Sequence, residues 1–322
     1  MNLPASPSAT ATSALIDLGH WLQSAGYGFV TPTPATHSRV NRRPGAERAR
    51  SVRDVFGWSR AFEPDLLAAD IVQAMESAGL LEQFPGGALR SRVRYSTLEG
   101  DLYAHSAFPT DQPDAIFFGP DTYRFASLIL AELARHPLRR NARILDVGCG
   151  AGPGGIVAAK ASRDAAPALV LADINAAALR FASANAALAG VEALFVLGDL
   201  FKPVTGQFDL IVANPPYLND RAQRTYRHGG GEWGGALSQR IVREGVHRLA
   251  PGGRLVLYTG VPIVDGRDPL IESLRTELDT LGWPWRYREL DPDVFGEELE
   301  EPSYARAERI AAVALVVARP PP

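Results

Sequence analysis

The sequence lacks the residues that staple small domains or anchor a chain in a membrane. It has one cysteine, Cys149, which excludes an intramolecular disulfide framework and a cysteine-rich zinc site. Its longest unbroken apolar run is nine residues, 310–318, whereas about 20 are needed to span a bilayer as a helix. Residues 1–13 have neither the basic start nor the apolar segment of a signal peptide. The sequence therefore predicts a cytoplasmic protein with no membrane segment.

Lysine is also scarce, and the net charge of −3 excludes a strong overall field toward nucleic acid. The histidines show no metal-ligand spacing, so we expect no metal site; they are His20, His37, His105, His136, His228 and His247. One segment differs, because residues 39–60 contain seven arginines against Glu47 and Asp54. Such a run is typical of a solvated surface, and it is also a weak indication of contact with RNA, the ribosome or an acidic protein.

The chain is long enough for roughly two domains of about 150 residues each. We expect residues 1–13 to be a disordered tail. Helical spacing follows at 14–24 and 64–78, and two strands at 90–98 and 102–107 predict a hairpin. Residues 14–115 therefore indicate a small α+β accessory domain. It is either a winged-helix-like arrangement or a small cap on the next domain.

From residue 116 onward, strands alternate with helices. The strands are expected at 143–147, 168–172, 193–197, 208–213, 254–258, 285–290 and 310–318. The helices are expected at 123–135, 155–163, 175–190, 238–249 (capped by Ser238) and 269–281. No helix separates the last two strands, so these should pair antiparallel at the sheet edge. Residues 116–322 thus predict an α/β domain with a Rossmann-like, seven-stranded, mostly parallel sheet and an antiparallel last strand.

A glycine-rich turn follows the first of these strands, with the pattern Asp146-x-Gly148-Cys149-Gly150-x-Gly152. Glycines let the backbone turn sharply and let a ligand lie against it, at the strand end where α/β sheets bind ligands. Gly150, Gly152 and Gly155 also satisfy the GxGxxG spacing of dinucleotide enzymes. However, an acidic residue at the strand end suits a positively charged amino-acid portion better than a pyrophosphate.

Two further acidic residues follow the next two strands. Asp173 follows the glycine turn at the spacing expected for accepting both hydroxyls of a ribose, and we favour this role; the alternative is a helix N-terminal acid before Asn175. Asp199 could accept a hydrogen bond from an adenine amino group while Leu200 packs on the ring; the alternative is a merely polar loop.

The most specific signal is Asn214-Pro215-Pro216-Tyr217, directly after the apolar strand 208–213. Two prolines remove two backbone donors and stiffen the chain. The Asn214 side-chain oxygen and the Pro215 carbonyl can then hold a planar NH2 group, with Tyr217 stacking on its π-system. Catalysis would come mainly from positioning the nitrogen in line with a methyl donor. An ordinary proline-rich loop is the alternative.

Together these motifs resemble the class I S-adenosylmethionine-dependent methyltransferases, specifically the amino-methylating group with an Asn-Pro-Pro-Tyr motif, over about residues 116–318. Pro120-Asp121-Thr122 resembles the segment near the cofactor in the release-factor glutamine enzymes of that group. The resemblance implies S-adenosylmethionine as cofactor, bound by Thr122, Asp146, Gly148, Cys149, Gly150, Gly152, Asp173, Ile174, Asp199, Leu200 and Asn214. It implies that Asn214, Pro215, Pro216 and Tyr217 bind the accepting nitrogen.

The resemblance leaves the methyl acceptor open. A protein glutamine amide, with a translation factor as partner, is our first hypothesis, and adenine or guanine in RNA or DNA is the second. The glutamine enzymes carry an all-helical N-terminal domain, whereas a hairpin is expected here. The glycine-rich segment 224–235 suggests a mobile lid that brings Tyr226, Arg227, His228 and Trp233 near the substrate. Remote alternatives are an NAD(P)-dependent oxidoreductase and a non-catalytic binding protein.

Overall fold

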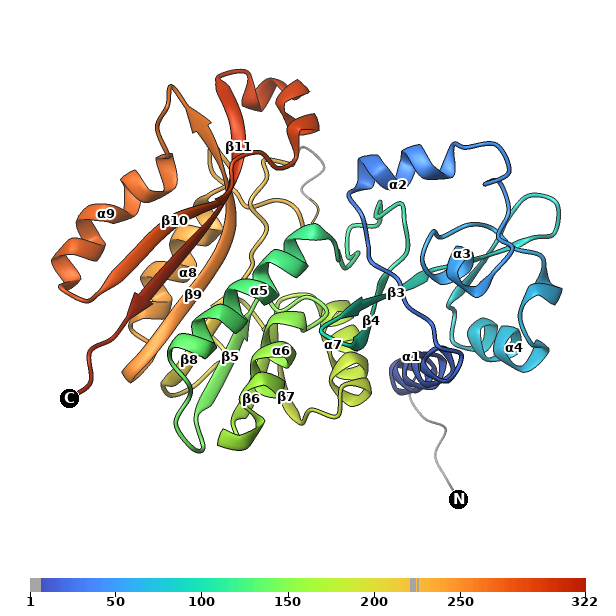
Figure 1. The fold of residues 1–322 in the computed structure, drawn as a ribbon, viewed down its shortest axis with the longest axis horizontal. Helices are drawn as coiled ribbons and strands as arrows, with labels where there is room; N and C mark the ends of the chain where they lie inside the picture. Colours follow the sequence, from blue (N-terminus) through green and yellow to red (C-terminus); the bar gives the residue numbers. More distant parts are fainter. Residues whose placement is uncertain (1–6, 221–223, 225) are drawn as a thin grey trace. The chain divides into compact units, whose positions relative to one another are not determined.

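The computed structural model describes residues 7–220, 224 and 226–322 (Figure 1). Its contacts divide the chain into two compact units. We call Met1–Arg124, Gly150–Pro153 and Ala177–Glu192 the accessory unit, and the remaining segments, Phe125–Cys149, Gly154–Ala176 and Ala193–Pro322, the sheet unit. This division differs from a single boundary at residue 115, because two short segments from the α/β region pack with the N-terminal part.

The sheet unit is built on seven strands in the order β10-β11-β9-β8-β5-β6-β7. Their bounds are β5 Arg143–Val147, β6 Ala168–Asp173, β7 Ala193–Leu197, β8 Phe208–Ala213, β9 Leu249–Val264, β10 Trp285–Asp291 and β11 Ala307–Ala318. Strand β11 runs antiparallel to both β10 and β9, and the pairs from β9 to β7 are parallel. The predicted mostly parallel sheet with an antiparallel last strand is confirmed, and so is the antiparallel pairing of the last two strands at the sheet edge, where β10 is outermost.

Helices follow the strands as the alternation indicates. They are α5 Pro120–Arg135, α6 Pro153–Ala161, α7 Ala176–Leu188, α8 Ala236–Val246 and α9 Pro269–Leu281, with short 3-10 helices η2 Arg163–Ala165, η3 Gly296–Glu300 and η4 Pro302–Tyr304. All six residues of β8 are buried, as expected for a strand covered on both faces. Ile241 of α8 and Leu274 of α9 pack with Ile211 and Leu257 in one core. The core is thus held by the apolar stripes of α8 and α9 on the central strands.

Two of the predicted bounds that differ from the structure of the sheet unit have a clear physical reason. Strand β9 continues through Pro251-Gly252-Gly253, which had indicated a turn; its register with β8 shifts between Phe208 and Leu210, so a bulge absorbs these residues. Helix α8 begins at Ala236 after Gly235 rather than at Ser238. The Ser238 hydroxyl is buried and lies 2.9 Å from the Thr259 hydroxyl on β9, so it serves the core instead of capping the helix.

The accessory unit combines short helices with two hairpins. The helices are α1 Pro7–Ser24, α2 Pro34–Asn41, α3 Val52–Phe56, η1 Pro64–Leu66 and α4 Ala69–Ser77. The hairpins are β1 Leu81–Gln83 with β2 Leu89–Ser91, and β3 Val93–Leu98 with β4 Asp101–Ser106. The predicted tail is corrected, because residues 7–13 are helical; residues 1–6 lie outside the described part. The predicted helix 64–78 is broken at Leu67, whose backbone is extended (φ −112°, ψ 155°).

The hairpin expected between residues 90 and 107 is confirmed as β3–β4, except that Arg90 belongs to β2. Its turn residues Glu99 and Gly100 both have positive φ, as a tight two-residue hairpin turn requires. The Tyr95 hydroxyl on β3 donates to the Leu15 carbonyl on α1 at 2.6 Å, which fixes the first helix to this hairpin.

Within the described residues, no helix combines the length and apolarity needed to cross a bilayer. The same residues contain no group of three or more His, Cys, Asp or Glu side chains placed to hold a metal ion.

Candidate functional site

The carboxyl ends of β5, β6 and β8 meet at one edge of the sheet. Val147 on β5 is in register with Ala172 on β6 and with Ala213 on β8. The amides of Gly148 and Cys149 both donate to the Ala172 carbonyl, at 2.9 and 3.0 Å. The turn after β5 therefore lies against Ala172, the residue before Asp173. Asn214 follows the end of β8, which is paired with β5 on its other side. Three of the predicted site segments converge for this reason.

Asp146 is a buried carboxyl at the end of β5, with 1% of its surface exposed. Its Oδ2 accepts a hydrogen bond from the Gly155 amide in the first turn of α6, at 2.7 Å. Burial raises the pKa of Asp146 to about 7; the Gly155 amide opposes this shift and the nearby Asp173 charge adds to it. Near neutral pH both the protonated and the ionised form of Asp146 are therefore populated, and a positive charge beside the carboxyl group would favour the ionised form.

The position of Asp146 depends on two glycines of α6 that sequence reasoning did not place in the site. A Cβ at Gly155 would lie 2.6 Å from Leu171 Cδ2, and one at Gly154 would lie 2.4 Å from Phe125 Cε1. Only glycine lets the helix approach the sheet closely enough to put its amide on Asp146. The GxGxxG spacing contains Gly155, so a signal existed, but it had been interpreted as a dinucleotide pattern.

The titration of Asp146 gives a pH prediction for cofactor binding. Because the free carboxyl is protonated below about pH 7, we expect the affinity for S-adenosylhomocysteine, which carries an amino group, to rise up to tenfold per pH unit toward pH 7 and then level off. By the same linkage, the ligand-free chain should lose stability as the pH rises from about 4 to about 7, because the folded state keeps a proton that the unfolded chain releases.

Isothermal titration calorimetry between pH 5.5 and 8.5 measures the affinity, and Asp146→Asn is the reference because it cannot titrate. A wild-type affinity that is flat over this range, or the same slope in Asp146→Asn, would show that this carboxyl does not face the cofactor cation.

Asp173 ends β6 and is buried, whereas Ile174 is 61% exposed. The Asp173 Oδ1 accepts a hydrogen bond from the Asn175 amide at 2.8 Å, just before α7. This contact is the local helix-start role that the sequence left open for Asp173. The ribose contact of Asp173 and the cofactor contact of Ile174 stay predictions.

Asp199 and Leu200 follow β7, but their side chains are already engaged. The Asp199 carboxylate lies 2.7 Å from Lys202 Nζ and 3.2 Å from Arg240 Nη2 on α8, and these two hydrogen bonds lower its pKa. Leu200 belongs to the buried core and has a φ of +47°, a strained conformation for a branched side chain. No pattern in the sequence indicated Arg240. The adenine contacts of Asp199 and Leu200 stay predictions.

The remaining cofactor positions lie in the glycine turn and in α5. Gly148, Gly150 and Gly152 all have positive φ (+65°, +54° and +82°), which only glycine adopts readily. A Cβ at Gly148 would meet no atom within 4 Å, so open space borders the turn on the sheet unit, where a cofactor would fit. Cys149 is buried. In the accessory unit, Thr122 is buried in the first turn of α5, and its hydroxyl accepts from the Gly119 amide at 3.3 Å.

The Asn214-Pro215-Pro216-Tyr217 segment, which we call the proline corner, leaves β8 at the same edge. Asn214 is half-buried, and its side chain has no hydrogen-bond partner among the described residues. The Pro215 carbonyl likewise accepts no hydrogen bond from this part of the chain. Two neighbouring oxygens are therefore available to a donor from outside the protein.

Tyr217, the last residue of the proline corner, is buried against other residues of the sheet unit. Its side chain is only 7% exposed, and its ring meets Phe295 edge to face with centroids 5.9 Å apart. A Cβ at Gly260 on β9 would lie 2.3 Å from Tyr217 Cε2, so the ring lies directly on that glycine. This packing leaves little of the ring for stacking by a base. Gly260 and Phe295 are far away in sequence, and no local pattern indicates them.

The glycine-rich segment packs its backbone on the proline corner. Leu218 and the segment exchange hydrogen bonds, from the Gly229 amide to the Leu218 carbonyl (2.9 Å) and from the Leu218 amide to the Arg227 carbonyl (3.1 Å). A Cβ at Gly229 would lie 1.9 Å from the Gly234 carbonyl oxygen and 2.6 Å from that of Pro216. These glycines therefore have a packing role. The predicted lid motion stays a prediction, and residues 221–223 and 225 lie outside the described residues.

An ion pair to η3 and a hydrogen bond to η4 fix this part of the chain, and Asp220 pairs with arginines of the glycine-rich segment. Buried Asp220 pairs with Arg224 (Nε to Oδ2, 3.0 Å), whose hydrogen bonds lower the pKa of Asp220. Arg227, which the sequence placed near the substrate, pairs with Asp220 and with Glu298 of η3. The Tyr304 hydroxyl of η4 accepts from the Asn219 amide at 2.7 Å. The acidic insertion after β10 thus holds the corner in place.

Comparison with known proteins identifies the chemistry. The family described as Methyltransferase small domain matches residues 115–261. A release factor glutamine methyltransferase of Deinococcus radiodurans is 34% identical over 218 residues, which cover 65% of this chain and 73% of that protein. Ribosomal RNA small subunit methyltransferase C of Serratia proteamaculans is 33% identical over 130 residues, or 40% of this chain and only 33% of that protein.

Among solved structures, the chain is similar to the T. thermophilus 16S rRNA N2 G1207 methyltransferase in complex with AdoMet and guanosine, with a TM-score of 0.46, 16% identity, and coverage of 81% of this chain and 64% of that one. The family resemblance inferred from the glycine turn and the proline corner is confirmed by the sequence relatives. The chain belongs to the methyltransferase small domain family and is an S-adenosylmethionine-dependent methyltransferase.

Proposed function

We propose that the chain methylates the nitrogen of a planar NH2 group, with the side-chain amide of a protein glutamine as acceptor. The observation that supports this most directly is the pair of unpartnered oxygens, Asn214 Oδ1 and the Pro215 carbonyl. An NH2 group can donate one hydrogen to each, and this holds its nitrogen in one plane. Among the described residues no protein group donates to either oxygen, so an incoming NH2 group does not have to displace a hydrogen bond of the protein.

The protein's contribution to the reaction is then chiefly positioning. S-adenosylmethionine supplies an electrophilic methyl group when bound, and Asp146, Gly148, Asp173 and Ile174, together with Thr122, Cys149, Gly150, Gly152, Asp199 and Leu200, are the residues proposed to hold it. The acceptor nitrogen forms its new bond to carbon as the carbon–sulfur bond breaks. The nitrogen then releases one proton, so the products are an N-methyl amide, S-adenosylhomocysteine and a proton. No strong base is needed beside Asn214, because the proton leaves a cationic nitrogen.

Two observations favour a glutamine amide over a nucleobase. Tyr217 is buried against Gly260 and Phe295, so a flat base would find little ring to stack on, whereas an amide needs only the two oxygens. The relative named for release factor glutamine also matches a larger share of this chain than the ribosomal RNA enzyme does. We therefore propose a translation factor with an exposed glutamine as the partner. A cytoplasmic location stays a prediction.

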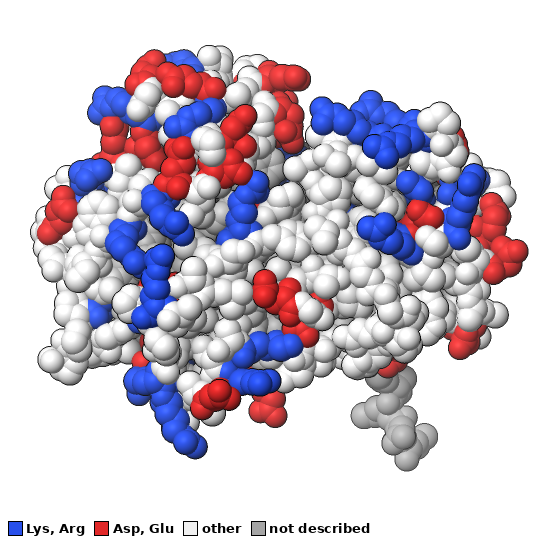
Figure 2. All heavy atoms as spheres, in the orientation of Figure 1, with Lys and Arg blue, Asp and Glu red and all other residues white. Residues whose placement is uncertain are grey.

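A nucleobase in RNA is the second candidate, on the basis of the arginines near α2. Figure 2 shows a cluster of basic side chains over this helix. Arg39, Arg42, Arg43 and Arg50 are exposed, and none forms an ion pair in the described part of the chain, although Arg50 adds its charge to the backbone hydrogen bonds that lower the pKa of Glu47. Exposed arginines of this kind contact phosphates without reading sequence, so they would add affinity for RNA and not choose the base.

Transfer of tritium from methyl-labelled S-adenosylmethionine tests the proposal. A bacterial release factor should take up label, and the same factor with its acceptor glutamine changed to glutamate should take up none. Purified ribosomal RNA serves as the competing acceptor. Label found in the RNA alone, or in neither acceptor, would overturn the glutamine assignment.

A further inference from the structure

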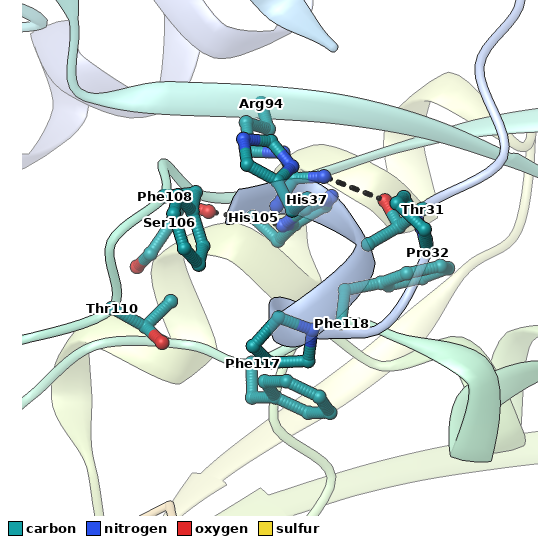
Figure 3. Close-up of a pocket in the computed structure, with 11 residues that line it drawn as sticks. Thr31, Pro32, His37, Arg94, His105, Ser106, Phe108, Thr110, Phe117 and Phe118 are labelled. Atoms are coloured by element: carbon teal, nitrogen blue, oxygen red, sulfur yellow. Dashed lines mark hydrogen bonds between the residues drawn. The ribbon is translucent and has the colours of Figure 1, made fainter. Parts of the chain in front are cut away.

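The accessory unit contains a polar cavity that the proposed methyl transfer does not use. Figure 3 shows it between the chain before α2, the helix α2 itself and the strands β3 and β4. Arg94 and His37 line it together with aromatic rings that include Phe108 and Phe118. Both polar side chains are almost completely buried.

Arg94 is a buried cation without a counter-charge. Only 3% of its surface is exposed, and no described carboxylate forms an ion pair with it. One guanidinium nitrogen, Nη2, donates to the Thr31 hydroxyl at 3.3 Å, while the buried Nε has no partner. Burial lowers the pKa of Arg94 to about 10, so the group is still charged at neutral pH. An uncompensated buried charge is strongly unfavourable unless an anion joins it.

His37 presents an unpartnered acceptor to the same cavity. Its Nε2 lies 2.8 Å from the Trp58 carbonyl and 3.1 Å from Asn41 Nδ2, which itself donates to that carbonyl. Because the shorter contact is to a group that can only accept, Nε2 carries the proton and Nδ1 carries the lone pair. Nδ1 is buried and has no partner. Burial lowers the pKa of His37 to about 3, so the ring stays neutral and can accept a hydrogen bond but not supply a charge.

Three other polar side chains at this place, those of Thr31, Ser96 and His105, satisfy one another. The Thr31 and Ser96 hydroxyls are hydrogen-bonded, and Ser96 Oγ lies 2.7 Å from His105 Nε2. The other His105 nitrogen, Nδ1, donates to the Ser106 carbonyl at 3.1 Å. The His105 ring is also stacked on Phe118. This closed chain leaves the Arg94 donors and the His37 acceptor for a ligand.

We propose that this cavity binds a phosphate group, either free phosphate or a phosphomonoester. A P–O⁻ oxygen would accept from Arg94 and neutralise it. The P–OH of HPO4²⁻, or of a phosphomonoester bound as its monoanion (second pKa about 6), would donate to His37 Nδ1. A carboxylate or sulfate has no proton to give His37 at neutral pH, and a water molecule would satisfy both hydrogen bonds but not the charge. The rings of Phe108, 4.1 Å from the His37 ring, and Phe118 exclude water and strengthen the pairing.

Thermal unfolding of the full chain at constant ionic strength tests this proposal. Phosphate at 100 times its Kd should raise Tm by about 2–4 °C relative to chloride, and sulfate should bind at least tenfold more weakly than phosphate by calorimetry. Arg94→Met should abolish the phosphate effect. Its Tm without phosphate should equal or exceed that of the wild type, because an unpaired buried charge has been removed. Arg92→Gln, at an exposed arginine two residues away, is the matched control and should keep the effect.

Free phosphate and a phosphomonoester are distinguished by comparing the binding of inorganic phosphate with that of adenosine 5′-monophosphate. Only a site for phosphomonoesters should bind adenosine 5′-monophosphate at least as tightly as inorganic phosphate. Equal stabilisation by sulfate and phosphate would overturn the role of His37. No phosphate-specific shift in the wild type, or an unchanged shift in Arg94→Met, would overturn the site. Should Arg94→Met fail to fold, the wild-type comparison of phosphate with sulfate decides alone. Neither readout depends on methyl transfer, so the proposed function and this site can fail separately.

Discussion

Asn214→Ala is expected to lower kcat by about 10²- to 10³-fold, the usual effect of removing one positioned hydrogen-bonding group from an active site. The side chain has no partner in the described chain, so its removal breaks no contact of the fold. Stability should therefore change little, and affinity for S-adenosylhomocysteine should largely remain. Single-turnover methyl transfer measures the rate, and calorimetry measures the affinity.

Gln207→Ala is a suitable control for the Asn214 variant, because it removes an exposed amide before β8 on the same chain segment. It should leave transfer unchanged. Unchanged turnover in Asn214→Ala would refute the role assigned to this oxygen. A proportional fall in cofactor affinity would mean that Asn214 binds the cofactor rather than the acceptor.

Gly229→Ala is the second variant with a large expected effect. The added Cβ would meet only backbone, 1.9 Å from the Gly234 oxygen and 2.6 Å from the Pro216 oxygen, so no side-chain rotation relieves the clash. The loop must move away from the proline corner, and the Pro215 carbonyl should lose its position. Because small misplacements at a reacting centre are costly, we expect kcat to fall by about 10²-fold with the sheet still folded.

Gly235→Ala lies in the same loop and provides the comparison. Its φ of −86° suits any residue, and an added Cβ would come no closer than 4.0 Å to Gln239 Nε2. Its activity should stay near that of the wild type. Equal losses in Gly229→Ala and Gly235→Ala would point to general sensitivity of the loop, and full activity in Gly229→Ala would show that its packing does not shape the corner.

The sheet could be predicted from sequence because its central strands are apolar runs with clear ends. Strands β5, β7 and β8 have the predicted bounds, and each is followed directly by glycine or asparagine. Pro251-Gly252-Gly253 misled because these residues form a bulge inside β9, and hydrogen bonds between Gly252, Gly253 and Arg319 override the local preference for a turn. Ser238 misled for a similar reason, since its hydroxyl bonds to Thr259 instead of capping α8. In both cases a tertiary contact outweighs a local signal.

The convergence of Asp146, Gly148, Asp173 and Asn214 was also predictable, since the carboxyl ends of parallel strands share one edge. The contacts that hold the site residues in place could not be predicted from the sequence. Arg240 on Asp199 and Phe295 on Tyr217 are contacts between distant segments without any periodicity. For Gly229 the only signal was the density of glycine after the proline corner, which suggested mobility rather than close packing.

A crystal structure with S-adenosylhomocysteine and a glutamine-containing peptide tests the central idea most directly. The glutamine nitrogen should lie within hydrogen-bond distance of both Asn214 Oδ1 and the Pro215 carbonyl, with its free face toward the sulfur. A peptide amide bound elsewhere, or those two oxygens occupied by groups of the protein itself, would contradict the account.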